Sequence, residues 1–144
     1  MAYWLVKSEP DVFSWDDQVK LGAKGGAWTG VRNHGAKLHL MAMKKGERAF
    51  YYHSNTERAV VGVVEVIRTA YPDPTDETGK FVCVDLKARA PFPTPVTLAA
   101  IKAQASLSSM VLVVNSRLSV QPVTDAEWTT ICAMGGLKEK RGAS

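Results

Sequence analysis

Residues 59–69 have the sequence AVVGVVEVIRT, which is the longest strand candidate in the chain. Valine and isoleucine dominate it, and β-branched side chains favour the half-buried surface of a sheet. Gly62 interrupts the run. A glycine inside a strand indicates a bend or the close approach of another part of the backbone, as in small barrels. We therefore expect this strand to run through a compact curled sheet or barrel.

Shorter strands are expected on both sides of this segment. Residues 81–88 alternate between apolar and polar or charged side chains, which predicts a half-buried antiparallel strand. Apolar and aromatic patterns predict further strands at residues 3–6, 48–52 and 117–123. The alternating segment is followed by prolines that predict a stiff connection, namely Pro91, Pro93 and Pro95.

Residues of the types that cap helices predict where the helices begin: Ser14, Asn33, Thr97 and Thr124. Glu127 completes a capping box with Thr124. The glycine-rich residues 22–27 are expected to form a flexible loop. Residues 106–115 carry an apolar run that fits either a short helix or a strand. Together these elements predict an α+β fold with about five or six strands and flanking helices.

The composition of the 144 residues is that of one ordinary globular domain, with 46% apolar and 22% charged residues. We expect this domain to span residues 1–136 and a basic, disordered tail to span residues 137–144. The net charge of +4 permits nucleic-acid binding without requiring it. No apolar run approaches the ~20 residues that a membrane span needs, and the N-terminal residues do not resemble a signal peptide.

The cysteines and histidines argue for a cytoplasmic protein without a metal site. Cys83 and Cys132 lie in apolar surroundings, which predicts free, buried thiols in a reducing cytoplasm. The histidines are His34, His39 and His53, and they lack the spacing of metal ligands. The glycines of residues 22–26 also lack the order found in nucleotide phosphate loops. We expect no metal and no cofactor.

The most informative candidate site is WTGVRN, residues 28–33. Asn33 occupies the N-cap position of a predicted helix. Arg32 offers a planar fork of donors suited to a phosphate or to a nucleobase. Trp28 adds an aromatic face, so the segment predicts one wall of a pocket for a flat, polar ligand. Such a pocket would suit an unstacked base, which proteins recognise by stacking and by hydrogen bonds to its edges.

Two alternatives to this pocket remain open. Aromatic residues 50–52 alternate in direction along a strand, so some of them must fill the core instead. Nucleophilic catalysis would need Ser8 to meet His53 across adjacent strands, with Lys7 and Glu9 nearby. No nucleophile elbow surrounds Ser8.

Five motifs occur in an order that resembles the EVE domain family. They are YWLVKSEP at residues 3–10, WTGVRN at 28–33, FYYHS at 50–54, YPDP at 71–74 and SRLSV at 116–120. The resemblance implies a PUA-like fold, a small mixed β pseudo-barrel flanked by helices, related to YTH and ASCH domains. It also implies a non-enzymatic module, expected to be a monomer, that binds a modified base, such as a modified cytosine, in DNA or RNA.

The same resemblance implies the residues of the base pocket. Carried over by motif, they are Trp4, Lys7, Ser8, Trp28, Arg32, Asn33, His53, Ser54 and Arg117. The alternative that the resemblance leaves open is an amidohydrolase or nucleotide-processing enzyme like ASCH relatives, using Lys7, Ser8 or Glu9.

The chain departs from the family pattern at two places. His34 stands where the family usually has an aromatic residue such as tyrosine. Residues 112–115 have the sequence LVVN where the family usually has Leu-Val-Arg-Gln, so Val114 replaces a cation expected near the nucleic-acid face or the rim of the pocket. No particular modified base is therefore assigned.

Overall fold

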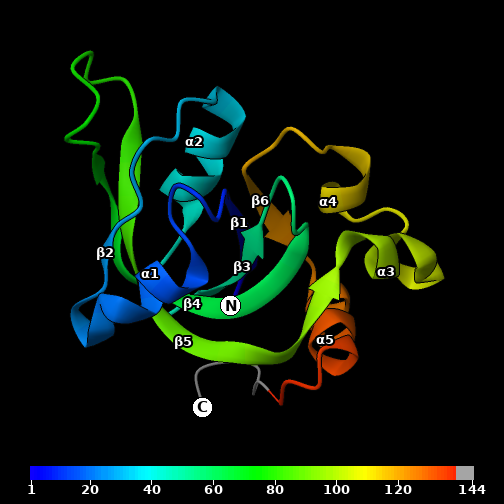
Figure 1. The fold of residues 1–144 in the computed structure, drawn as a ribbon. Coiled ribbons are helices and arrows are strands. Elements are labelled where there is room, and N and C mark those ends of the chain that lie inside the picture. Colours follow the sequence, from blue (N-terminus) through cyan, green and yellow to red (C-terminus); the bar gives the residue numbers. More distant parts are fainter. Residues whose placement is uncertain (139–144) are drawn as a thin grey trace.

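The computed structural model describes residues 1–138 and contains one mixed sheet of six strands in the order β2-β5-β4-β3-β1-β6 (Figure 1). β1 and β3 pair in parallel, and every other neighbouring pair is antiparallel. The strands are β1 (Tyr3–Ser8), β2 (Gly26–Ala27), β3 (Arg48–His53), β4 (Ala59–Pro72), β5 (Val82–Thr97) and β6 (Val120–Val123). The sheet does not close into a barrel, because β2 and β6 form its two edges. The α+β class and the strand number are confirmed.

Helices cover both faces of this sheet. They are α1 (Trp15–Lys20), α2 (His34–Ala42), α3 (Leu98–Ala103), α4 (Val111–Val114) and α5 (Asp125–Met134), with 3₁₀ turns η1 (Gly22–Lys24) and η2 (Ala105–Leu107). Figure 1 shows α1 and α2 on one side of the central strands and α3, α4 and α5 on the other. The helix starts predicted from the sequence are confirmed, because the side chains of Ser14, Asn33, Thr97 and Thr124 all accept a hydrogen bond from the first turn.

Gly62 allows α1 to pack directly on β4. A Cβ atom at Gly62 would lie only 2.5 Å from Cη2 and Cζ3 of the Trp15 ring. The pairing of β4 with β5 is also irregular between Val60 and Gly62. Both observations fit the bend or close approach expected at this glycine, although the partner is an indole ring and not a second backbone.

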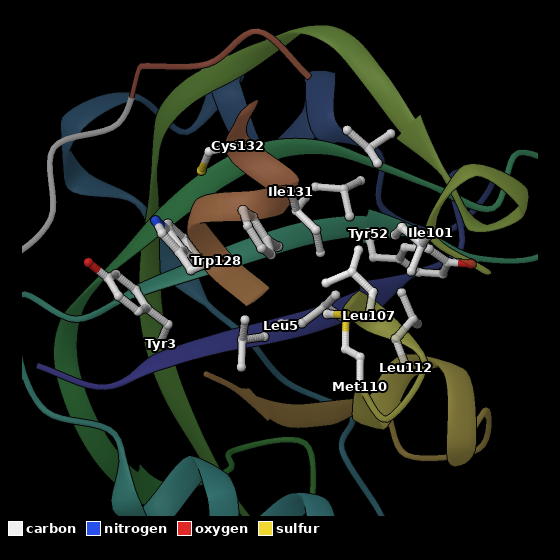
Figure 2. Close-up of a cluster of buried hydrophobic side chains, with 14 of the residues drawn as sticks. Tyr3, Leu5, Tyr52, Ile101, Leu107, Met110, Leu112, Trp128, Ile131 and Cys132 are labelled. Carbon is white, nitrogen blue, oxygen red and sulfur yellow. The ribbon is translucent and has the colours of Figure 1, made fainter. Parts of the chain in front are cut away.

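The two faces of the sheet carry separate apolar clusters. On one face, the rings of Phe50 and Trp128 stack with centroids 3.9 Å apart, and Tyr3 stacks on Trp128 at 4.2 Å (Figure 2). Tyr51 points to the other face, into the cluster that contains Leu40 of α2. Phe50 and Tyr52 belong to the first cluster, so the expected alternation along β3 is confirmed.

The structure corrects several boundaries predicted from the sequence. The prolines at 91–95 continue β5 and do not interrupt it. β2 pairs with β5 only at residues 85–86, so no described strand pairs with the edge that carries the prolines. The glycine-rich loop contains η1 and the short strand β2. Residues 105–107 and 111–114 are helical, and the last strand begins at Val120.

The end of the described chain stays attached to the core. The backbone N–H of Leu137 donates to the carbonyl of Cys132 at 2.9 Å, and the Leu137 side chain packs on the apolar cluster of Trp128. The remainder of the predicted basic tail, residues 139–144, lies outside the described residues. Cys83 and Cys132 are both buried, and neither forms a disulfide within the described residues, as expected. Within residues 1–138, no helix has the length and apolar character needed to cross a bilayer.

We predict that Gly62→Ala destabilises the protein by about 1–3 kcal/mol, the usual cost of overpacking a core. Alanine in place of a strand glycine ordinarily stabilises by about 0.5–1 kcal/mol, so the sign of the effect tests the contact with Trp15. Urea unfolding of the wild type and the variant measures it. In a Trp15→Leu background the penalty of Gly62→Ala should shrink, because the atoms that clash are gone. An unchanged or higher stability of Gly62→Ala would contradict the prediction.

Candidate functional site

A cavity of about 770 Å³ lies where β1 ends, between the loop that follows β1 and the segment 27–33. Its volume falls in the range of about 300–1,000 Å³ that is typical of small-ligand pockets. The predicted site residues that line it are Lys7, Ser8, Trp28, Arg32 and Asn33. Glu9, which belongs to the alternative catalytic set, also lines it. The structure therefore brings together the end of the first strand and the WTGVRN segment, as the sequence suggested.

Trp28 forms an aromatic wall of this cavity. Its ring is half-buried and meets Tyr51 edge-to-face at 5.4 Å and Phe13 edge-to-face at 6.4 Å. Its backbone N–H donates to the carbonyl of Val84 at 2.8 Å. The indole is thus held from behind by other rings, which leaves part of it exposed to a ligand in the cavity.

The carbonyl of Phe13 is held by two hydroxyl groups. Ser8 Oγ donates to it at 2.6 Å and the Tyr51 hydroxyl donates to it at 2.8 Å. Burial raises the pKa of Tyr51, so its hydroxyl keeps the proton that it donates. The loop after β1 is therefore fixed against the sheet. Phe13 and Val12 line the cavity and were missed in the sequence, where two apolar residues in a loop give no distinguishing signal.

Lys7 places a cation at the edge of the cavity. Its Nζ donates to the carbonyl of Ser116 at 2.7 Å and lies 5.9 Å from the centroid of the Tyr52 ring. Burial lowers the pKa of Lys7, because the charged ammonium loses contact with water. An ammonium has three N–H donors, so the bond to Ser116 leaves two for a ligand.

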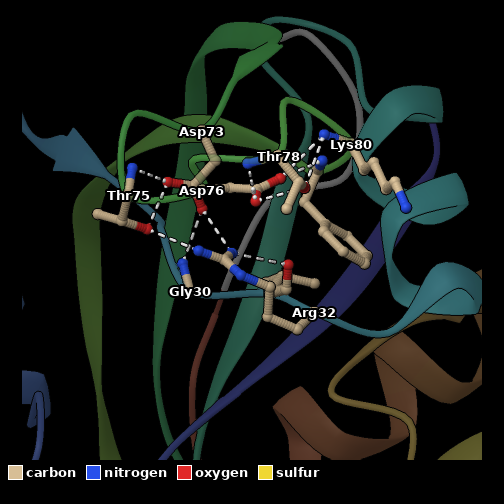
Figure 3. Close-up of polar contacts among 9 residues, drawn as sticks. Gly30, Arg32, Asp73, Thr75, Asp76, Thr78 and Lys80 are labelled. Atoms are coloured by element: carbon tan, nitrogen blue, oxygen red, sulfur yellow. Dashed lines mark hydrogen bonds and ion pairs between the residues drawn. The ribbon is translucent and has the colours of Figure 1, made fainter.

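Asp73 fixes the opposite wall. Its carboxylate is buried and accepts from the Gly30 backbone N–H at 2.9 Å and from Arg32 Nη1 at 3.1 Å (Figure 3). It also accepts from the backbone N–H and the hydroxyl of Thr75. Burial alone would raise the pKa of Asp73, but the hydrogen bonds from Thr75, Gly30 and Arg32 outweigh it and lower the pKa.

This contact changes the role expected of Arg32. Its Nη1 binds Asp73 and its Nη2 donates to the Thr75 hydroxyl at 2.9 Å. The guanidinium was predicted to face a ligand with a free fork of donors, whereas both terminal nitrogens already have protein partners. Asp73 was missed as a site residue, although it stands between two prolines in the YPDP motif, a setting typical of a built turn.

A second carboxylate organises the loop beyond Asp73. Asp76 accepts from the backbone N–H and the hydroxyl of Thr78, and from the backbone N–H groups of Lys80 and Phe81 (Figure 3). The hydroxyl bond from Thr78 is the main reason that the pKa of Asp76 falls to about 2. The loop that carries Asp73 therefore has its own internal support.

Asn33 caps a helix and also lines the cavity. Its Oδ1 accepts from the Ala36 backbone N–H at 2.9 Å and so caps α2. The same side chain lines the cavity, where its amide NH₂ is available as a donor. His34, at the position where the family pattern has an aromatic residue, is not part of the lining and instead lies against Phe81 with ring centroids 5.1 Å apart.

The remaining predicted site residues do not line this cavity. Trp4 is buried and donates from Nε1 to Glu47 at 2.9 Å; on its strand it lies four residues before Ser8, roughly 13 Å away. His53 is also buried and accepts from the Trp15 backbone N–H at 2.9 Å through Nε2. Ser54 lines a neighbouring cavity, which Ser116 also lines. Arg117 follows Ser116 in the sequence and is exposed. Membership of the same family motifs was therefore not sufficient to predict which residues line this cavity.

No group of three or more His, Cys, Asp or Glu side chains placed to hold a metal ion occurs within the described part of the chain.

Comparison with known proteins identifies the family. The model of the EVE domain matches residues 2–134. The chain belongs to the EVE domain family. It is 31% identical over 165 residues to human thymocyte nuclear protein 1, an alignment that covers 92% of this chain and 73% of that protein.

Solved structures of EVE-like chains have the same fold. The NMR structure of Rpa0253 from Rhodopseudomonas palustris is 66% identical with a TM-score of 0.91, and the match covers 97% of each chain. The crystal structure of human THYN1, in complex with DNA that contains 5-methylcytosine, is 32% identical with a TM-score of 0.86. That match covers 96% of this EVE domain and all of the THYN1 chain (100%).

We predict that Asp73→Asn lowers the free energy of unfolding of this EVE domain by about 1–3 kcal/mol at neutral pH, because an NH₂ group replaces one of the two acceptor oxygens and the negative charge is lost. The lowered pKa means that the Asp73 contribution is complete above the ordinary carboxyl pKa of about 4 and is lost as the pH falls below it. Thermal unfolding between about pH 7 and pH 3 should therefore show the wild type and the variant converging as the pH falls.

Asp11→Asn is the matched control, because Asp11 is an exposed carboxylate on the loop after β1. It should change stability little at any pH. A difference between wild type and Asp73→Asn that stays constant across this range would contradict the role given to the Asp73 charge.

Proposed function

We propose that this EVE domain is a non-enzymatic nucleic-acid-binding module that recognises a modified base, a modified cytosine or a similar base, in the cavity beside Trp28. The observation that carries the proposal is that the half-buried ring of Trp28 lines the same cavity as three polar residues, Lys7, Ser8 and Asn33. The complex of human THYN1 with DNA containing 5-methylcytosine supports it.

Each part of the cavity has a use in binding a base. The Trp28 ring offers a stacking surface, which contributes about 1–3 kcal/mol per base. Lys7, Ser8 and Asn33 offer the hydrogen-bonding groups that would read the edge of the base. A base inside a duplex cannot reach such a cavity, so recognition of duplex DNA would require the base to leave the stack.

The charge of the walls favours a neutral ring over an anionic metabolite. Arg32 is paired with the buried Asp73 carboxylate at 3.1 Å, which offsets its charge. Among the described residues of the lining, Lys7 is then the remaining cation, and the exposed Glu9 carboxylate lies on the same rim. A flat, uncharged and polar ligand suits this balance better than a phosphate does.

The hydrolytic alternative gains less from the geometry. Ser8 and His53 would have to meet to form a nucleophile and its base. Ser8 Oγ donates to the Phe13 carbonyl at 2.6 Å, whereas His53 Nε2 accepts from the Trp15 backbone at 2.9 Å and His53 Nδ1 lies 2.5 Å from Glu57. Both side chains therefore have partners of their own.

We predict that the wild type binds short oligonucleotides with a modified cytosine more tightly than unmodified ones, and that Trp28→Ala removes the difference. The loss of one stacked base should weaken binding of the modified strand about fivefold to 150-fold. Fluorescence anisotropy at several salt concentrations measures both affinities, because electrostatic contacts alone vary with salt.

Met41→Ala is a control for the loss of an apolar side chain, since Met41 is exposed on α2 and does not line the cavity. It should leave both affinities unchanged. Equal affinity of the wild type for modified and unmodified strands, across a panel of cytosine modifications, would refute the proposed function.

A further inference from the structure

A second cavity of about 370 Å³ adjoins the base pocket and shares Lys7 with it. It lies between the β3–β4 turn, α3 and the segment after α4. The lining residues that matter here are Lys7, Tyr52, Asn55, Arg58, Lys102 and Ser116. Three of these side chains are cationic, and no carboxylate belongs to the part of the lining that the structure describes.

Arg58 is held in a backbone conformation that arginine rarely adopts. Its φ is +50°, in the left-handed region, and Asn55 in the same turn has a φ of +76°. Asparagine tolerates this region, but a long side chain is strained there. The conformation is fixed from both sides, because the Leu98 N–H donates to the Arg58 carbonyl at 2.8 Å and Arg58 Nε donates to the Asn55 carbonyl at 3.0 Å. Strain that is kept at a charged residue points to a function.

Hydrogen-bond donors dominate the charged and polar side chains that are described in this lining. Tyr52 is buried, with 3% of its surface exposed, and its hydroxyl is the polar group that it contributes. Figure 2 shows this hydroxyl at the outer edge of the apolar cluster. The acidic residue of the turn, Glu57, is occupied by His53 Nδ1 at 2.5 Å. Three cationic side chains and a phenol therefore line a space to which the described residues contribute no carboxylate.

Burial raises the pKa of Tyr52, and the nearby charge of Arg58 opposes that rise only in part. The phenol therefore remains a donor at neutral pH. A guanidinium, an ammonium and a hydroxyl donor together form the usual set for a phosphate group.

We infer that this second cavity binds the backbone phosphate of the strand next to the base held beside Trp28. Lys7 lies on the boundary of the two cavities, so one ligand would occupy both. The unit that the domain recognises is then a nucleotide within a strand and not a free base. This inference rests on the proposed function, because it assigns a partner to the base that the first cavity takes.

Arg58→Asn tests the inference without disturbing the turn, since asparagine accepts the left-handed conformation of Arg58. The melting temperature should stay the same or rise. Binding of modified and unmodified oligonucleotides should weaken by the same factor, about tenfold, and the slope of log K against log salt should fall in magnitude by about 0.7–0.9, as for one lost phosphate contact. The ratio between modified and unmodified strands should not change.

Two further variants complete the comparison. Arg58→Lys keeps the charge and should retain most of the affinity and the full salt slope, because lysine also binds phosphate as a point charge. Lys24→Gln removes a charge of the same sign from η1, at the opposite side of the sheet from α3 (Figure 1), and should change neither quantity.

Wild-type affinity and slope in Arg58→Asn would overturn the inference and leave the base-reading proposal intact, provided that Trp28→Ala still removes discrimination. If the wild type binds modified and unmodified strands equally, while Arg58→Asn still lowers the slope of log K against log salt, the proposed base recognition is overturned and the phosphate contact is supported. Inorganic phosphate is the second probe. If it binds the wild type in an Arg58-dependent way while oligonucleotide binding is independent of Arg58, the cavity serves a free phosphate compound and the inference fails.

Discussion

The contact of Trp15 with Gly62 positions both cavities. Because β4 carries no side chain at this point, the indole lies directly on the strand and seats α1 against the sheet. The start of α1 is also joined to the end of β3, because the backbone N–H of Trp15 donates to His53 Nε2 at 2.9 Å. The preceding loop presents Phe13 to Trp28 on one side, and His53 holds the β3–β4 turn through Glu57 on the other. The absence of a side chain at Gly62 thus influences where the walls of both cavities lie.

The other wall of the cavity beside Trp28 has a different kind of support. Residues 28–33 have no regular secondary structure, so their backbone depends on side-chain contacts. Asp73 supplies these by accepting from Gly30 and Arg32 while it is itself fixed by Thr75. A buried carboxylate with several donors is costly to remove but also precise in geometry. Side-chain hydrogen bonds thus fix this wall although it is a loop, which would suit the recognition of closely similar rings proposed above.

The periodic features of the chain could be predicted from the sequence, whereas contacts between distant loops could not. Alternation in β3 separated Tyr51 from its neighbours, and capping residues located the helix starts, because both depend on local spacing. The proline-rich part of β5 was missed, since its tolerance depends on an edge that only the sheet order reveals. Lys7, Ser8, Trp28, Arg32 and Asn33 were grouped from the sequence, and the structure places them around one cavity. Asp73 lies more than forty residues from Arg32 along the chain, and no local pattern joins them.

Lys7 belongs to the lining of both cavities. If one cavity binds a base and the other a phosphate, as proposed, this shared residue affects the kinetics of binding. Long-range attraction between charges mainly accelerates encounter, whereas contacts made in a fitted, partly dry pocket mainly slow dissociation. The second cavity, with its cationic side chains, would therefore determine how fast a strand associates. The cavity beside Trp28 would determine how slowly that strand dissociates. A strand without the right base would arrive as quickly and leave sooner, which allows the domain to survey many sites without being trapped on them.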